Sequence, residues 1–187
     1  YLTSNPLYRG AGVSSIEPSL LTELQQMTTD APLILTGTAT PNLVLAPRGI
    51  GDIGPIDIGY HYPIIDYAVG LTIANTTVLL TNGVVITPIS YYGFYMEGGE
   101  LVSEGVPARY NRILPSTLVQ EQKTFWNNIS PSATTVIYPV ATAPSLANKV
   151  SLRFSAVEKH HYSGYHSFLD AGGMPTGSRF ALRDSHL

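Results

Sequence analysis

Short apolar runs separated by turn-forming residues make up most of the chain from residue 33 onward. The runs are rich in Leu, Val, Ile and Tyr and are bounded by Gly, Pro, Asn or Thr, a pattern typical of short β-strands. Asn82-Gly83 supplies the positive φ angles of a tight turn, and Pro88 removes a hydrogen-bond donor where a ladder must end. The predicted strands include residues 33–35, 43–45, 71–73, 78–80, 84–86, 94–96 and 101–103.

One segment near the N-terminus has a helical period instead. Leu20, Leu21, Leu24 and Met27 recur at i, i+1, i+4 and i+7, as on one face of a helix. Pro18 suits the first turn, because a proline there loses no intrahelical hydrogen bond. The sequence therefore predicts one short helix that begins near Pro18.

Strands this short suit two all-β architectures. In a solenoid each strand pairs with its counterpart one coil away, whereas a β-sandwich or jelly roll is built with tight hairpins. The chain has no exact internal repeat, only a loose similarity among its apolar triplets, which is typical of an irregular β-helix. We expect a solenoid, with a β-sandwich or jelly roll as the alternative.

Five motifs in a fixed order support this choice. They read DIGPIDIGYHYP at 52–63, LLTNGV at 79–84, YGF at 92–94, EGGELVSE at 97–104 and VQEQ at 119–122. This order resembles segments of large secreted right-handed parallel β-helix proteins of environmental bacteria, over about residues 50–125. The resemblance implies a right-handed parallel β-helix and a secreted or cell-surface location. It brings no catalytic residues, because that family is mostly without assigned activity.

The same resemblance divides the chain at residue 63. Residues 1–63 are expected to hold the N-terminal helix and the closing loop of a preceding β-helical stretch, because the DIG element resembles sequences that end such stretches. Residues 64–187 are expected to form β-helical coils. A proline-rich excursion is expected at 130–149, where prolines occur among Ser, Thr and Ala.

The composition excludes several kinds of partner. Charged residues make up 12% of the 187 residues and the net charge is -3, whereas ~25% charged residues is typical. With only three lysines the chain has no evident basic stripe, so neither nucleic acid nor an anionic membrane surface is expected as a partner. The apolar runs are too short for a membrane span, and the lack of cysteine excludes disulfides and thiolate chemistry.

Two groups of residues are of the types that bind metals. Asp52 and Asp57 lie in a glycine-rich stretch and could present carboxylate and carbonyl oxygens to calcium, but the same residue types build a capping turn without metal. His160, His161 and His166 lack the spacing of a zinc site, because adjacent residues of an extended chain point to opposite faces. No cofactor is expected, with calcium at the two aspartates as the alternative.

One charge cluster could serve a polysaccharide lyase or a glycoside hydrolase. A lyase needs a base and a hydrolase needs two carboxylates beside the scissile bond. The cluster contains Glu97, Glu100, Glu104, Arg109 and Arg112, of which Glu100, Glu104 and Arg109 are the weak catalytic candidates. Glu100 and Glu104 would share one face of a strand. The alternative is structural, with Glu104 and Arg112 as a solvated or coil-capping pair.

Tyrosines are the remaining candidates for ligand binding. Tyr91, Tyr92 and Tyr95 form one group, and Tyr162 and Tyr165 form a second. A tyrosine on a rigid β surface can stack on a sugar ring and donate a hydrogen bond from its hydroxyl. The same residues also form aromatic ladders that only support a β-helix.

The expected function is a structural or adhesive segment of a secreted or cell-surface bacterial β-helix protein that assembles with copies of itself. The alternative is a carbohydrate-binding or polysaccharide-cleaving β-helix module. The chain lacks the G-x-S-x-G elbow of esterases and the glycine-rich loops that bind phosphates. Any enzymatic activity would therefore be that of a lyase or glycoside hydrolase, and the expected partners are copies of the chain or a polysaccharide.

Overall fold

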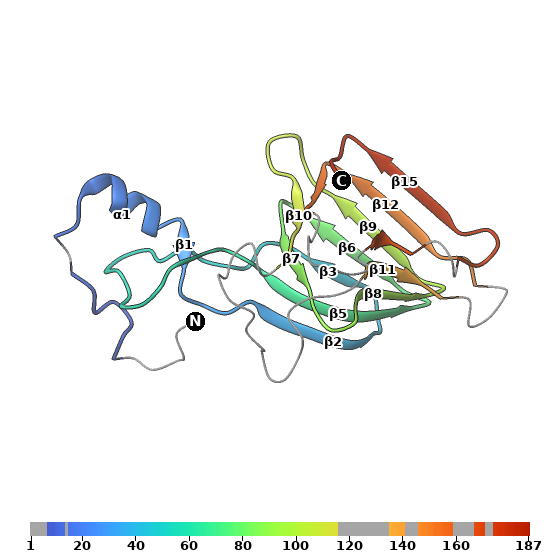
Figure 1. The fold of residues 1–187 in the computed structure, drawn as a ribbon, viewed down its shortest axis with the longest axis horizontal. Coiled ribbons are helices and arrows are strands. Elements are labelled where there is room, and N and C mark those ends of the chain that lie inside the picture. The colour runs from blue at the N-terminus through green and yellow to red at the C-terminus, as the bar shows by residue number, and fades with distance from the viewer. Residues whose placement is uncertain (1–6, 14, 116–134, 141–145, 159–166, 171–173) are drawn as a thin grey trace.

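The computed structural model describes residues 7–13, 15–115, 135–140, 146–158, 167–170 and 174–187. These residues form a body of short strands, from which a smaller N-terminal module projects (Figure 1). In the described part no helix has the length and apolar character that a membrane span requires.

The strands of the body follow one another in five successive passes, each of which is a stretch of chain that contains two or three strands. Every strand predicted from the sequence falls on an observed one. The first pass contains β2 (Leu33–Ala39) and β3 (Leu43–Leu45), and the second contains β5 (Tyr67–Ala74), β6 (Thr77–Thr81) and β7 (Val85–Pro88). The third contains β8 (Tyr92–Glu97), β9 (Glu100–Glu104) and β10 (Asn111–Ile113), and the fourth contains β11 (Thr135–Pro139), β12 (Lys149–Arg153) and β13 (Ser155–Val157). The fifth contains β14 (Ser167–Leu169) and β15 (Arg179–Arg183).

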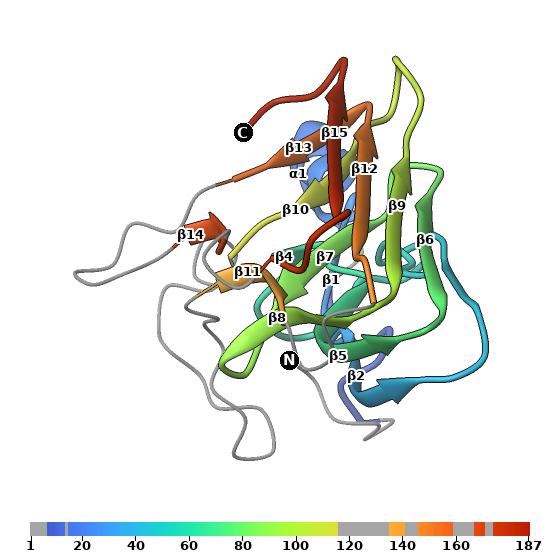
Figure 2. The same ribbon diagram turned by 90° about the vertical axis from the view of Figure 1, so that its right-hand side faces the viewer.

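Strands of successive passes pair in parallel. One sheet has the order β3-β6-β9-β12-β15, which is the order of the passes (Figure 2). The second has the order β13-β10-β7-β5-β8-β11-β14, with β2 paired to β5. Strand β5 links the two halves of this second sheet, because its start pairs with β7 and its end pairs with β8. The protein is thus mostly β with parallel sheets, an arrangement compatible with a solenoid. A jelly roll needs antiparallel ladders, and between described strands only β1 and β4 pair that way.

The five-stranded sheet contains a repeat that the sequence does not display. In register its strands read TVLLT, ELVSE, KVSLR and RFALR, preceded by LVL in β3. In β6, β9 and β12 the second and fourth positions are buried, and the other three face outward. Alternate residues of a strand point to opposite faces of its sheet, so each pass adds one layer to the same core.

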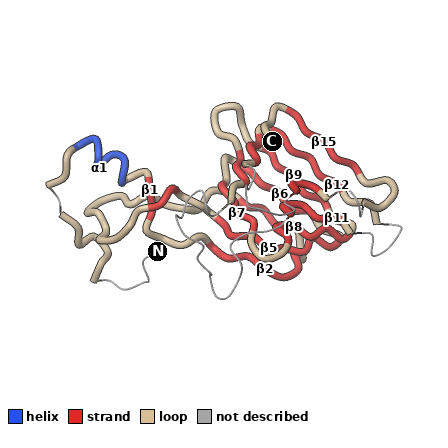
Figure 3. Tube along the Cα trace, in the orientation of Figure 1, coloured by secondary structure: helices blue, strands red, loops and turns tan. Residues whose placement is uncertain are grey.

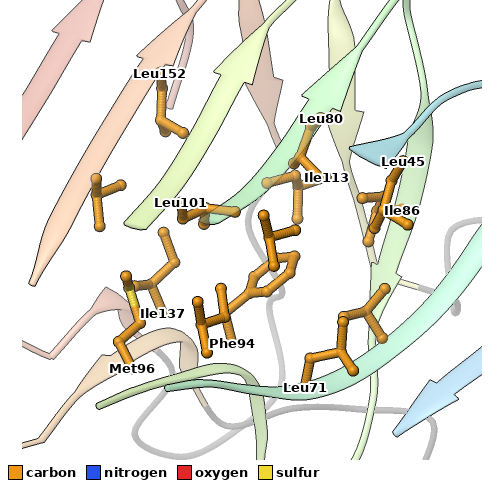
Figure 4. Close-up of a cluster of buried hydrophobic side chains, with 14 of the residues drawn as sticks. Leu45, Leu71, Leu80, Ile86, Phe94, Met96, Leu101, Ile113, Ile137 and Leu152 are labelled. Carbon is orange, nitrogen blue, oxygen red and sulfur yellow. The ribbon is translucent and has the colours of Figure 1, made fainter. Parts of the chain in front are cut away.

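The core lies between the two sheets (Figure 4). Phe94 is its largest fully buried side chain and is contributed by β8. Met96 from the same strand, Leu101 from β9 and Ile137 from β11 lie around it and are equally inaccessible. The core therefore joins residues of several passes, each of which supplies only two or three apolar side chains per strand.

The N-terminal module consists of residues 7–13, 15–30 and 46–66. The predicted helix is present as α1 (Pro18–Leu24), and the Glu17 carboxylate caps it by accepting the amide hydrogens of Ser19 at 3.0 Å and Leu20 at 3.2 Å. Strand β1 (Met27–Thr28) pairs with β4 (Tyr62–Pro63) and closes the module (Figure 3).

Two features of the strand pairing bear on the predicted division of the chain. Pairing within the body begins at Leu33 rather than after residue 63, because β2 and β3 pair with β5 and β6. The DIG segment therefore lies in an insertion between two paired passes, after β2 and β3 and before β5. Strand β11 lies inside the predicted excursion at 130–149, and β8 and β14 flank it.

Candidate functional site

The carboxylate of Asp57 holds the N-terminal module together. It is 8% exposed. Its oxygens accept hydrogen bonds from Thr29 Oγ1 at 2.6 Å, Arg9 Nη1 at 3.0 Å and the Gly10 amide at 2.7 Å. Arg9 also pairs with Asp30. Burial alone raises the pKa of Asp57, but the bonds from Thr29 and Gly10 and the charge of Arg9 outweigh it and hold the pKa below its usual range.

Asp52 is engaged in the same way. Its Oδ2 accepts the Asp57 amide at 2.7 Å and lies 2.6 Å from His61 Nε2. The other ring nitrogen of His61 lies 3.2 Å from the Gly59 carbonyl oxygen. Each ring nitrogen of His61 therefore lies beside one oxygen of the module. His61 thus contacts polar groups of the module's own loop.

The two aspartates hence act as a capping centre for the module. A hollow of about 380 Å³ lies beside them, lined in part by Arg9, Thr29 and Gly51. A cation there would have to displace the N–H and O–H donors that now fill the carboxylates. Among the described residues no three His, Cys, Asp or Glu side chains are grouped to hold a metal; His160, His161 and His166 lie outside those residues.

The lowered pKa of Asp57 predicts acid sensitivity of the module. The ionised carboxylate stabilises the folded state above its unfolded pKa of about 3.9, and this contribution is lost as pH falls through the lower folded-state pKa. We expect the module to loosen below about pH 4. An NMR titration of the Gly10 amide, which donates to Asp57, would check this. In Asp57→Asn the acid transition of Gly10 should disappear; a midpoint near neutral pH in the unaltered protein would contradict the assignment.

A third aspartate, Asp66, joins the module to the body and was not singled out from the sequence. It is 2% exposed. Its Oδ1 accepts the amide hydrogens of Arg48 and Gly49, both at 2.7 Å, and its Oδ2 accepts that of Val85 at 2.8 Å. One side chain thus satisfies backbone donors of the insertion and of β7.

A buried polar cluster at the end of the five-stranded sheet was also missed. The Asn111 side chain donates to the Leu80 carbonyl and to Ser103 Oγ, both at 2.9 Å. Ser103 Oγ lies 2.7 Å from Ser155 Oγ one pass further on. Three passes are therefore joined by side-chain hydrogen bonds inside the core, which explains why Asn and Ser occupy inward positions.

The structure places the acidic candidates Glu100 and Glu104 at the two ends of β9. Glu100 and Glu104 do share the outer face of β9, as predicted, but four residues along a strand place them ~13 Å apart. This backbone separation is larger than the ~5–9.5 Å between the carboxylates of glycoside hydrolases. The third candidate, Arg109, packs its side chain against Gly83. A Cβ added at Gly83 would lie 1.9 Å from Arg109 Cγ.

The predicted pair of Glu104 with Arg112 is wrong. Arg112 lies on β10, between β7 and β13, and pairs with Glu158. Glu104 lies in the other sheet, and its carboxylate is 4.0 Å from Arg153 on β12. Each ion pair therefore joins successive passes, because partners come from the register between passes rather than from proximity in sequence.

The first tyrosine group does come together, with a member that the sequence did not identify. Tyr138 of β11 stacks on Tyr92 with ring centroids 4.0 Å apart and on Tyr95 at 5.7 Å. Tyr91 is 64% exposed and meets Tyr92 edge-on at 4.8 Å. Burial and the hydrogen bond with Tyr138 raise the pKa of Tyr92. The rings stack mainly on one another; Tyr162 and Tyr165 lie outside the described residues.

A polar groove runs past the first residues of β6, β9 and β12. Its volume is about 320 Å³. The groups that line it are hydroxyls, amides and two charges of opposite sign, the groups that hydrogen-bond sugars. They come from Asn42, Asn75, Thr76, Thr77, Glu100 and Lys149.

Cationic side chains gather on β12 and β15, although the sequence shows no basic stripe, and one of them, Lys149, also lines this groove. Lys149 and Arg179 are register partners on β12 and β15, and so are Arg153 and Arg183. All four are exposed and face outward. The outer face of β12 and β15, here called the cationic face, therefore carries four of the chain's ten Lys and Arg residues.

Comparison with protein-family models, with curated protein sequences and with solved structures found no match to the chain.

Proposed function

We propose that the protein is a structural or adhesive segment of a secreted or cell-surface bacterial right-handed parallel β-helix protein, and that it associates with copies of itself. The observation that carries the proposal is the unbroken parallel register across five passes. Such stacking makes a rigid rod whose strength comes from repeated neighbour contacts. A rigid rod suits a scaffold or an adhesin.

The use of the charged side chains supports this proposal. Glu104 with Arg153 and Arg112 with Glu158 bridge neighbouring passes. The carboxylates of the N-terminal module accept hydrogen bonds that maintain its own loops. Acidic and basic groups that hold passes together are what a scaffold needs, whereas an enzyme needs them aimed at one reacting atom.

The last strand offers a surface for a second copy. Phe180 and Leu182 of β15 are 37% and 38% exposed, whereas their register partners Val150 and Leu152 are 3% and 1% exposed. Among the described strands, β15 is paired on one side only, as is β3 at the other end of the same sheet. An unpaired edge with apolar inward positions favours addition of another strand. The β3 edge of a second copy would continue the apolar columns with Leu43 and Leu45.

Leu182→Lys is expected to abolish this association, because it places a charge in the apolar column of the open edge. Sedimentation velocity over a concentration series should show a larger species that is lost in this variant. Leu187→Lys, the same substitution at a side chain that is 61% exposed, should keep it. An unaltered protein that stays monomeric throughout, or equal effects of the two variants, would refute self-association.

The second candidate function is that of a carbohydrate-binding module, which the polar groove and the exposed Tyr91 favour. Cleavage of a polysaccharide is the weaker form of this candidate, because the backbone positions of Glu100 and Glu104 are ~13 Å apart, a wide spacing for two carboxylates that flank one bond.

A further inference from the structure

The five-stranded sheet places opposite charges side by side on β9 and β12 but like charges side by side on β12 and β15. In the two outer columns β9 has Glu100 and Glu104, and β12 places Lys149 and Arg153 beside them, so the columns alternate in sign. Strand β15 then places Arg179 beside Lys149 and Arg183 beside Arg153. Like charges directly opposite on paired strands are destabilising, and a break of this kind is expected at functional sites.

The excess positive charge is only partly neutralised. Arg153 lies 4.0 Å from a Glu104 oxygen and 3.9 Å from an Asp184 oxygen, and its guanidinium also lies over the Phe154 ring. Within the described ranges no ion pair involves Lys149, Arg179 or Arg183. Three exposed cations on two neighbouring strands are therefore available to an external anion.

We propose that the cationic face binds an acidic polysaccharide that lies across β12 and β15 and whose carboxylate or sulfate groups pair with Lys149, Arg153, Arg179 and Arg183. The two columns are ~13 Å apart, and the cations within a column are separated by the ~4.8 Å spacing of neighbouring strands. A polymer with a charge on each sugar can meet both cations of a column without bending, because the sheet holds them in a fixed row.

The surface between the columns suits a sugar chain. The central outward positions of β12 and β15 are Ser151 and Ala181, whose short side chains leave room between the long cationic ones. The same column continues as Val102 on β9 and Leu79 on β6, which can contact the apolar faces of sugar rings. Lys149 also lines the polar groove, so hydroxyls of the same polymer can reach its amide and hydroxyl groups.

Two other roles explain the positions of the four cations less completely. These roles are protection of the sheet edge and binding of nucleic acid. Charges on an edge strand can prevent unwanted strand pairing, but that role needs only β15, and two of the cations lie on the internal strand β12. Single-stranded nucleic acid is usually bound on aromatic side chains that stack on its bases. The outward residues of β6, β9, β12 and β15 include no aromatic side chain.

The experiment measures binding of polygalacturonate, dextran sulfate, neutral dextran and oligo(dT) by biolayer interferometry. Arg179→Gln/Arg183→Gln should weaken binding of the acidic polymers roughly tenfold, the sum of two exposed ion pairs. The matched control Arg109→Gln/Arg112→Gln removes the same charge elsewhere and should change affinity less than about twofold. Arg179→Lys/Arg183→Lys should retain binding. Lys149→Gln provides an independent test of the same column if the double variant unfolds.

Three outcomes would overturn the proposal. Equal loss in the control pair would mean that net charge alone governs binding, and dextran binding as tight as that of the acidic polymers would remove any role for the cations. Tighter binding of oligo(dT) than of polygalacturonate and dextran sulfate would assign the face to nucleic acid. The inference rests on the proposed adhesive role. Leu182→Lys tests self-association and keeps all four cations of the cationic face. Failure of self-association and failure of glycan binding can therefore be told apart.

Discussion

Asn111→Ala is expected to lower the free energy of unfolding by about 3–4 kcal/mol, a loss typical of breaking a buried hydrogen-bond network. The side chain is fully buried. Besides its two donated bonds, its Oδ1 accepts the amide hydrogens of Gly83 at 2.8 Å and Val84 at 3.2 Å. Truncation strands these groups in the core, where water cannot replace the missing partner. Urea unfolding followed by circular dichroism would measure the change.

Asn42→Ala is the matched control for this prediction. Asn42 also accepts a backbone amide, that of Thr77 at 3.0 Å, but it is exposed. Water can take over its hydrogen bonds, so we expect a loss below about 1 kcal/mol. Similar losses in the two variants would mean that burial does not set the cost, and that the Asn111 network is not what joins the passes.

Asp66→Asn is expected to cost about 2–3 kcal/mol although it changes the shape of the side chain very little. Both carboxylate oxygens of Asp66 accept backbone amide hydrogens. In either orientation the amide group of asparagine would point its own N–H at one of these donors. The loss should appear as a lower urea midpoint and as faster hydrogen exchange at the Arg48 and Gly49 amides.

Asp30→Asn provides the comparison for Asp66. Its side chain is 58% exposed and pairs with the half-exposed Arg9, and exposed ion pairs contribute ~0–1 kcal/mol. We expect little change in the urea midpoint. If Asp66→Asn is as mild as Asp30→Asn, the three short contacts of Asp66 do not anchor the N-terminal module to the body.

The positions of the strands and of the main turns could be predicted because the signals are local. The alternation around 78–80 and 101–103 directs alternate residues inward in any sheet, and both segments are strands. Asn82-Gly83 forms the predicted turn, with φ angles of 59° and 80°. Pro18 begins helix α1 for an equally local reason.

The candidate sites were predicted less well, because a shared face on one strand does not reveal the partner on the next. Closeness in sequence favours Arg112 as the partner of Glu104, but Glu104 meets Arg153, which the register brings from the following pass. Tyr138 joins Tyr92 and Tyr95 for the same reason. The four cations of the cationic face are dispersed in sequence, so nothing local marks them as one group.

By itself the sequence determined which residues are extended, which turn and which side of a strand is apolar, since these properties depend on neighbours one to four residues away. Only the tertiary structure decided that residues 46–66 are an insertion and that Asn111 and Asp66 are structural centres. It also decided that Lys149, Arg153, Arg179 and Arg183 share one face. The physical reason is the parallel register: each strand pairs with one a whole pass away, and the length of chain between them varies from pass to pass.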